Sequence, residues 1–223
     1  MAFDVLYEDN HLLVVDKPAG IPTMGVRDDR PTMLSLAKEY IRTKYNKPGN
    51  VYLGIVSRLD APVTGVLLIA RTSKAARRLT DAFRSRTVEK CYLALVEGHL
   101  AEPSGRLEHY LRKDERHRRM HTTTAAAPDA QRAVLRYEVV SAQADTSLVQ
   151  VKLETGRKHQ IRVQLAKLGH AIVGDRKYGS MRPFAQGIAL HSHRLLLEHP
   201  VQKSPVEVVA PLPKYWPRGV LPR

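Results

Sequence analysis

The chain has 223 residues, enough for one large domain or two small ones, and its 43% hydrophobic content can form a sizeable core. The 36 Lys and Arg residues outnumber the 22 Asp and Glu residues, and the resulting net charge of +14 favours a polyanionic partner such as a nucleic acid. No apolar run is long enough to span a membrane, and the single cysteine excludes an internal disulfide or a cysteine-rich zinc site, so we expect a cytoplasmic protein.

Two strands and two helices are expected in the first part of the chain. Apolar runs predict strands over residues 12–15 and 66–70. Helical spacing predicts a helix over residues 33–44, with Thr32 as its N-cap, and an amphipathic helix over residues 73–86. The apolar stripe of the second helix is formed by Ala75, Leu79, Ala82 and Phe83, and arginines occupy its other faces.

The second part of the chain has more strands than helices. A strand is predicted over residues 92–96, and the polar, basic segment 112–132 is expected to be a loop excursion. Strands are then predicted over residues 134–140 and 147–153, followed by a helix over residues 158–168. Strands interspersed with few helices indicate an α+β fold. The inward face of the last helix is expected to carry Ile161, Leu165 and Leu168.

The most informative segment leads a carboxylate into the strand at residues 66–70. Arg58-Leu59-Asp60 lies in a predicted turn, and Thr64-Gly65 follows it. This order places an ionisable Asp at the edge of a sheet, where a substrate can reach it. On its own, an Asp before a turn is more often a turn former or a helix cap than a catalytic group. A second acid, Asp175, lies beside Tyr178-Gly179 and predicts a structural turn.

Several other blocks accompany the Asp60 motif, and they are Asp16–Gly20, Lys90–Gly98, Leu153–Arg162, Val173–Gly179 and Ala189–Pro200. In this order, the motifs resemble those of RluA-like RNA pseudouridine synthases, the ribosomal large-subunit type, over about residues 3–215. The resemblance implies an α+β pseudouridine synthase fold with a mostly antiparallel sheet and a central catalytic cleft. It also implies a single catalytic domain over residues 1–223, with no separate N-terminal RNA-binding module.

The resemblance implies that the chain isomerises uridine to pseudouridine in ribosomal or transfer RNA without a cofactor or a metal. The reaction breaks the bond from ribose to uracil N1 and rejoins the base through C5. A carboxylate can attack covalently or stabilise positive charge on the sugar. Catalytic roles are implied for Asp60, Tyr92 and Arg162. Substrate-binding roles are implied for Arg58, Leu59, Thr64, Arg157 and His159.

Three of these residues have two interpretations each. Arg162 follows the inward-facing Ile161, so it can pair with Asp60 and keep that carboxylate ionised, or it can bind a phosphate. Tyr92 can be a core residue, or its ring can pack on the target uracil with its hydroxyl facing the sugar. Arg58 can contact phosphates, or it can fill the gap that a flipped-out base leaves.

Two positions depart from the family pattern, since Ser57 stands where His is usual and Thr64 where Ser is usual. The missing ring at Ser57 keeps open an alternative function, a non-catalytic RNA-binding factor that retains the fold. A base- or sugar-cleaving hydrolase is a third possibility. It normally needs two carboxylates that flank the bond, and no second acid is indicated near Asp60. We expect a monomer that binds an RNA stem-loop through the catalytic domain and residues 112–132.

Overall fold

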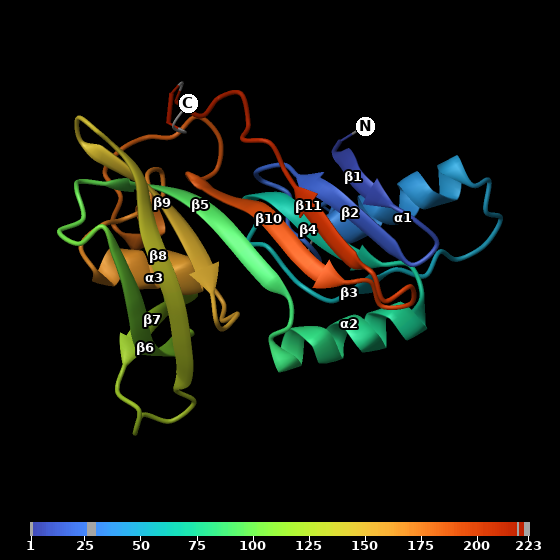
Figure 1. Ribbon diagram of the computed structural model, residues 1–223, viewed down its shortest axis with the longest axis horizontal. Coiled ribbons are helices and arrows are strands. Elements are labelled where there is room, and N and C mark those ends of the chain that lie inside the picture. Colours follow the sequence, from blue (N-terminus) through green and yellow to red (C-terminus); the bar gives the residue numbers. More distant parts are fainter. Residues whose placement is uncertain (1, 26–29, 218, 221–223) are drawn as a thin grey trace. The chain divides into compact units, whose positions relative to one another are not determined.

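The computed structural model describes residues 2–25, 30–217, 219 and 220, which form two compact units (Figure 1). Unit 1 consists of Met1–Glu89 and Ser192–Leu212. Unit 2 consists of Lys90–His191 and Pro213–Arg223. Unit 1 is therefore assembled from two segments that are far apart in the sequence.

Unit 1 is built on a sheet in which the order of strands is β1-β2-β4-β10, with β3 paired to β4 and β11 paired to β10. The β1–β2, β2–β4, β3–β4 and β10–β11 pairs are antiparallel. The first two residues of β10 belong to unit 2. The strand bounds are β1 (Asp4–Glu8), β2 (Leu12–Lys17), β3 (Gly54–Ile55), β4 (Thr64–Ala70), β10 (Leu190–Glu198) and β11 (Pro205–Val209).

Two helices accompany this sheet, and both begin with a threonine cap. Helix α1 (Met33–Lys44) starts after Thr32, whose side chain accepts a hydrogen bond from the N–H of Ser35 in a capping box. Helix α2 (Ser73–Ser85) starts after Thr72, whose side chain accepts from the N–H of Ala75. The predicted span of α1 is confirmed in full, and α2 ends one residue earlier than expected.

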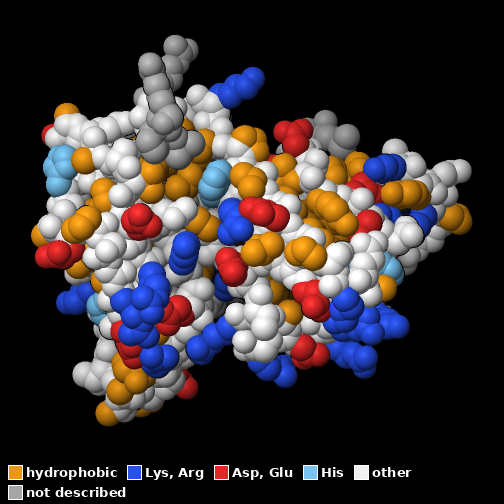
Figure 2. Space-filling view, in the orientation of Figure 1, with side chains coloured by type: hydrophobic (Ala, Val, Ile, Leu, Met, Phe, Trp, Pro, Cys, Tyr) orange, Lys and Arg blue, Asp and Glu red, His pale blue; other side chains and the backbone are white. Residues whose placement is uncertain are grey.

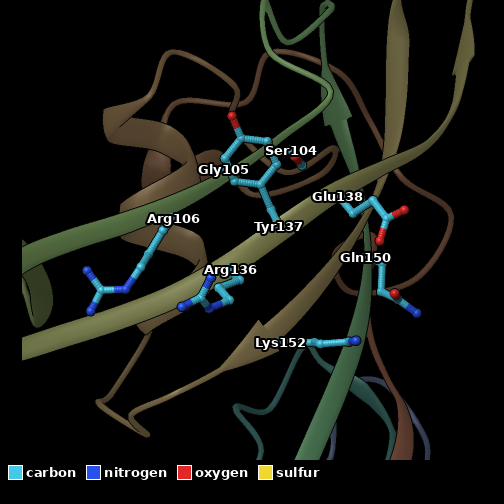
Figure 3. Close-up of a pocket in the computed structure, with 8 residues that line it drawn as sticks. All are labelled: Ser104, Gly105, Arg106, Arg136, Tyr137, Glu138, Gln150 and Lys152. Atoms are coloured by element: carbon cyan, nitrogen blue, oxygen red, sulfur yellow. The ribbon is translucent and has the colours of Figure 1, made fainter.

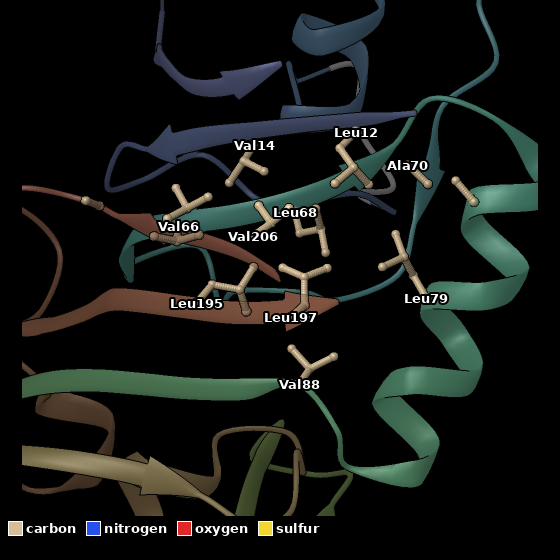
Figure 4. Close-up of a cluster of buried hydrophobic side chains, with 13 residues drawn as sticks. Leu12, Val14, Val66, Leu68, Ala70, Leu79, Val88, Leu195, Leu197 and Val206 are labelled. Atoms are coloured by element: carbon tan, nitrogen blue, oxygen red, sulfur yellow. The ribbon is translucent and has the colours of Figure 1, made fainter. Parts of the chain in front are cut away.

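One hydrophobic core of unit 1 lies between α2 and one face of the sheet (Figure 4). Ala75 and Leu79 of α2 are buried there, and Ala82 and Phe83 pack against the cluster, as the helical periodicity predicts. Residues that alternate with these sheet positions are also fully buried, so both faces of the sheet are covered. The strand residues of the cluster include Leu12, Val14, Val66, Leu68, Leu195, Leu197, Val206 and Val208.

Unit 2 is an antiparallel sheet in the order β5-β9-β8-β6-β7. Helix α3 (Gln160–Lys167) buries Val163 against Leu111, Met120 and Ala133. Ile161 and Leu165 are buried as predicted, but Leu168 is 39% exposed because the helix has ended there. The remaining bounds are β5 (Glu89–Glu97), β6 (Ser104–Asp114), β7 (Arg119–Thr123), β8 (Gln131–Gln143), β9 (Thr146–Leu153) and the 3-10 helix η1 (Arg176–Tyr178).

The predicted loop over residues 112–132 is wrong for about half of its length. Strand β6 continues to Asp114, β7 covers Arg119–Thr123 and β8 begins at Gln131, so the segment is mainly a β-hairpin followed by a short loop. Charged residues stand at successive positions of the hairpin and hide the alternation that normally reveals a strand. The α+β class is confirmed, and no helix in the described ranges is long and apolar enough to cross a membrane.

Candidate active site

Asp60 lies in the loop between β3 and β4, and hydrogen bonds fix the backbone around it. Its C=O accepts from the N–H of Val63 at 3.0 Å, which closes a turn just before β4. The next carbonyl, Ala61 O, accepts from the N–H of Gly20 at 2.8 Å and from Lys17 Nζ at 3.0 Å. The half-buried Asp60 carboxylate is therefore carried by a turn that β2 and the residues after it hold in place.

Lys17, the last residue of β2, is fully buried and links this turn to the sheet. Its Nζ also donates to Pro18 O at 2.8 Å. Burial lowers the pKa of Lys17 to about 7, and the neighbouring carboxylates of Asp60 and Asp16 oppose that shift. The Lys17 ammonium and the Asp60 carboxylate are therefore close enough to attract each other.

A close approach of two strands requires a glycine at the second position of β4. Thr64 is buried, and Gly65 has a φ of +102°. A Cβ on Gly65 would lie 2.2 Å from the carbonyl oxygen of Ser192 in β10. This is a steric clash, and only glycine, which has no Cβ, avoids it. Gly65 therefore has a steric reason that is independent of any substrate.

Arg58 and Leu59 precede Asp60 and have different surroundings. Arg58 is exposed, so its guanidinium can reach an RNA phosphate or base. Leu59 is buried, so its side chain fixes the turn in the core of unit 1. The predicted residues Arg58, Leu59, Asp60 and Thr64 thus lie together in unit 1, while the other four belong to unit 2.

Arg162 of α3 forms a buried ion pair with Asp175 in unit 2. Arg162 Nε lies 2.7 Å from one oxygen of Asp175, and Nη2 lies 2.9 Å from the other. The two side chains are only 6% and 2% exposed. The predicted turn at Asp175 is present, since its C=O accepts from the N–H of Tyr178 at 2.9 Å. The sequence alone does not reveal this pairing, although a buried arginine requires a partner such as a carboxylate.

Tyr178 connects this ion pair to the β6–β7 hairpin. The guanidinium carbon of Arg162 lies 5.0 Å from the centre of the Tyr178 ring, a cation–π distance. The Tyr178 hydroxyl accepts a hydrogen bond from the N–H of Met120 at 2.9 Å and contacts His159 Nδ1 at 2.7 Å. His159 lies just before α3, with a φ of 53°. The predicted residues His159 and Arg162 therefore both contact Tyr178. No sequence pattern indicates this role for Tyr178.

The two remaining predicted residues of unit 2 differ in exposure. Tyr92 lies on β5 with only 9% of its surface exposed, as expected for a packed or stacking ring. Arg157 is exposed, and its Nε donates to Arg132 O at 3.0 Å. The guanidinium of Arg157 is therefore held against the first residues of β8.

A cavity of about 320 Å³ lies on β6, β8 and β9 of unit 2 (Figure 3). Strand pairing places Lys152 and Arg136 in a row with Cys91, whereas Tyr92 pairs with Val151 in the adjacent row. Adjacent rows of a sheet point to opposite faces, so the Lys152 and Arg136 side chains lie on the face opposite Tyr92. We therefore exclude this cavity from the candidate active site.

Exposed basic residues are distributed unevenly (Figure 2). On β6 and β8, exposed arginines form ion pairs with glutamates, for example Arg132 with Glu108 at 2.6 Å. On α2, by contrast, no ion pair in the described part of the chain involves the exposed basic residues. These unpaired residues are Lys74, Arg77 and Arg84 of α2 and Arg86, which follows its last residue.

Comparison with known proteins agrees with the motifs. Residues 11–167 match the family model of the RNA pseudouridylate synthases. An uncharacterized RNA pseudouridine synthase of Zymomonas mobilis is 37% identical, with 96% of this chain and 95% of the relative covered. A ribosomal large subunit pseudouridine synthase D of Xylella fastidiosa is 33% identical, with 95% of this chain and 66% of the relative covered.

Solved structures give the same result for the fold. The human RNA pseudouridylate synthase domain containing 1 has a TM-score of 0.74 at 28% identity, over 94% of this chain and 83% of that one. The human domain containing 4 protein has a TM-score of 0.79 over 95% of this chain and 89% of that one, but at 24% identity it shows the fold alone. The chain therefore belongs to the RNA pseudouridylate synthase family, whose members isomerise uridine in RNA.

Proposed function

We propose that this protein isomerises specific uridines in ribosomal or transfer RNA and that the carboxylate of Asp60 is its catalytic group. The observation that supports this proposal most strongly is the turn of Asp60, which is half-buried and close to the buried ammonium of Lys17. A catalytic carboxylate has to keep one orientation and a negative charge through the reaction. The hydrogen bonds to Ala61 provide the first requirement, and Lys17 favours the second.

The reaction requires an anion but neither an oxidant nor a phosphate donor. The bond between ribose C1′ and uracil N1 breaks, the detached base turns, and C1′ forms a new bond to C5. The proton that leaves C5 passes to solvent or to a base, while N1 gains one. Asp60 serves either as a nucleophile or as the counter-charge of a positive sugar, and both roles need the ionised carboxylate.

We assign supporting roles to residues of both units. Arg162 is proposed as a partner of Asp60, and Asp175 orients its guanidinium through two hydrogen bonds. Tyr92 is proposed to pack on the uracil and to direct its hydroxyl towards the sugar. The exposed Arg58 is proposed to occupy the gap left by the flipped base, and Arg157 and His159 are proposed to contact the RNA.

RNA binding is supported by the net charge of +14 and by where the basic residues lie. The outer face of α2 and the β6–β7 hairpin present cations that can contact phosphates without reading bases. Such contacts suit a folded stem-loop, in which the spacing of phosphates is regular. We propose that these surfaces position the RNA while the Asp60 turn performs the reaction.

Release of tritium from RNA labelled at uridine C5 tests the proposal. The substrate would be ribosomal and transfer RNA from cells that lack the protein, because their target uridines are unmodified. We expect release by the wild type with the RNA chain intact, and none by Asp60→Asn, which keeps the shape of the side chain but not its charge. Full activity of Asp60→Asn would disprove the catalytic role of Asp60.

The same assay distinguishes the alternative functions. RNA binding without tritium release would identify a non-catalytic RNA-binding factor. This alternative is considered because Ser57 stands where the family usually has a His ring. Abasic sites without isomerised uridine would identify a hydrolase. Mapping pseudouridine in RNA before and after incubation would then identify the target position.

A further inference from the structure

We propose that Thr23 is a positioning residue for Asp60. Thr23 is 3% exposed and belongs to none of the motifs discussed above. Its hydroxyl forms hydrogen bonds with Leu59, the residue immediately before Asp60. It therefore fixes the backbone on the N-terminal side of the carboxylate. The inference rests on the proposed catalytic role of Asp60.

The Thr23 hydroxyl uses both of its hydrogen-bonding functions on a single residue. Thr23 Oγ1 donates to Leu59 O at 2.8 Å. The N–H of Leu59 donates back to Thr23 Oγ1 at 3.1 Å. Leu59 is buried, so its two backbone groups depend on this hydroxyl instead of water. Only a group that donates and accepts at the same point can satisfy both, and a serine can replace it whereas a valine cannot.

The backbone of Thr23 is itself attached to a helix. The N–H of Met33 donates to Pro22 O at 2.9 Å, and the N–H of Leu34 donates to Thr23 O at 3.1 Å. These two donors belong to the first turn of α1, where the backbone N–H groups have no acceptors within the helix. Thr23 therefore transmits the fixed position of α1 to Leu59.

The residue after Asp60 is held separately, through the contacts of Ala61 O with Gly20 and Lys17. Asp60 thus lies between two residues that are anchored to different elements, α1 on one side and β2 on the other. Removing the Thr23 hydroxyl leaves a buried N–H and a buried C=O of Leu59 without partners, so the turn has to rearrange to satisfy them. A small displacement of a catalytic carboxylate lowers the rate of reaction much more than it lowers binding.

The test compares Thr23→Val, which keeps the shape but loses the hydroxyl, with Thr23→Ser, which keeps the hydroxyl. Ser147→Ala is the matched control, because it removes one buried hydroxyl, which donates to Gly98 O at 2.9 Å in unit 2. Single-turnover tritium release at saturating enzyme gives the rate constant, and filter binding of the same labelled RNA gives its Kd. We expect Thr23→Val to lower the rate constant about ten-fold or more with Kd nearly unchanged, and Thr23→Ser and Ser147→Ala to stay close to wild type.

A second measurement does not depend on activity. Hydrogen exchange in the peptide covering residues 56–62 should become faster in Thr23→Val than in Thr23→Ser, while exchange in β2 and β4 stays slow. If Thr23→Val does not fold, Thr23→Ala and Thr23→Ser provide the same comparison, since they differ by one hydroxyl.

Each result has one interpretation. A wild-type rate constant in Thr23→Val, or unchanged exchange at residues 56–62, would overturn the positioning role while leaving Asp60 as the catalytic group. A wild-type enzyme that releases no tritium, or an active Asp60→Asn, would overturn the proposed function and the role of Thr23 together. A rate lost equally in Thr23→Val and Ser147→Ala would show that general destabilisation is the cause.

Discussion

Arg162 and Asp175 share two hydrogen bonds in a nearly water-free environment, with 2.7 Å from Nε and 2.9 Å from Nη2 to the carboxylate oxygens. Burial of either charge alone would be strongly unfavourable, so each depends on the other for its place in the fold. The ring of Tyr178 lies against the same guanidinium. This arrangement fixes the plane of the proposed Arg162 partner before any RNA is bound.

Substitution of Asp175 should therefore affect stability far more than substitution in an exposed ion pair. We expect Asp175→Asn to lower the free energy of unfolding by about 3 kcal/mol, because it leaves a buried guanidinium with less compensating charge. Arg136→Gln, in the exposed pair with Glu154, should lower it by less than about 1 kcal/mol. Urea denaturation of both variants measures the difference, and equal losses would contradict the assigned role of burial.

Tyr92 can be tested by separating its ring from its hydroxyl. Tyr92→Phe keeps the packing of the buried ring, so its stability and RNA affinity should stay near those of the wild type. If the hydroxyl acts as a general base, the rate of isomerisation should fall about 100-fold. Tyr92→Ala should in addition lower the free energy of unfolding by about 3 kcal/mol. A fully active Tyr92→Phe would restrict Tyr92 to packing.

Asp16 should make the stability of unit 1 depend on pH. Burial, and then the charge of its cross-strand neighbour Asp4, raises the pKa of Asp16 from 3.8 to about 6. The folded state thus holds this proton more tightly than the unfolded state, so the stabilisation is complete below about pH 4 and is lost as the pH rises through about 6.

Asp16→Asn removes this titration while keeping an oxygen that can accept the hydrogen bond of the Gly65 N–H. We expect the variant to be more stable than the wild type by about 2 kcal/mol at pH 8 and to show no such gain at pH 4. Urea denaturation at several pH values provides the comparison. The same difference at both pH values would mean that the titration of Asp16 is not the cause.

The outer face of α2 should contribute to the salt dependence of RNA binding. Arg77 and Arg84 lie two helical turns apart and therefore on one face. If both contact phosphates, Arg77→Gln/Arg84→Gln should weaken binding and reduce the slope of log Kd against log salt concentration by between one and two.

Arg42→Gln/Lys47→Gln removes the same number of charges from another exposed part of unit 1 and is the matched control. Fluorescence anisotropy with a labelled RNA stem-loop at several KCl concentrations measures both slopes. Equal weakening in the two variants would show that net charge, and not the α2 face, governs binding.

The sequence was a good guide wherever local rules decide the structure. Helix α1 begins and ends as predicted because Thr32 provides a side-chain acceptor and because Met33, Ala37 and Ile41 form a buried stripe. Family motifs identified the Asp60 turn, and in the structure that turn leads into β4.

Local rules failed where a structure depends on distant partners. The β6–β7 hairpin carries charges on both faces, so its strands are defined by pairing and not by alternation. Asp175 is separated from Arg162 by 13 residues, and only the folded chain shows that they meet. The hydroxyl of Thr23 bonds a residue 36 positions away, which no sequence period encodes.

The discontinuous composition of unit 1 also governs the order of events during synthesis. Leu195, Leu197, Val206 and Val208 fill the core beside Leu12, Val14 and Leu68, so the early strands cannot cover their apolar face until the late strands exist. A nascent chain leaves the ribosome from its N-terminus, and it must therefore carry this uncovered surface through translation of Lys90–His191 of unit 2. Chaperones that bind exposed apolar segments would have their longest opportunity in that interval, and a prematurely terminated chain would remain in that state.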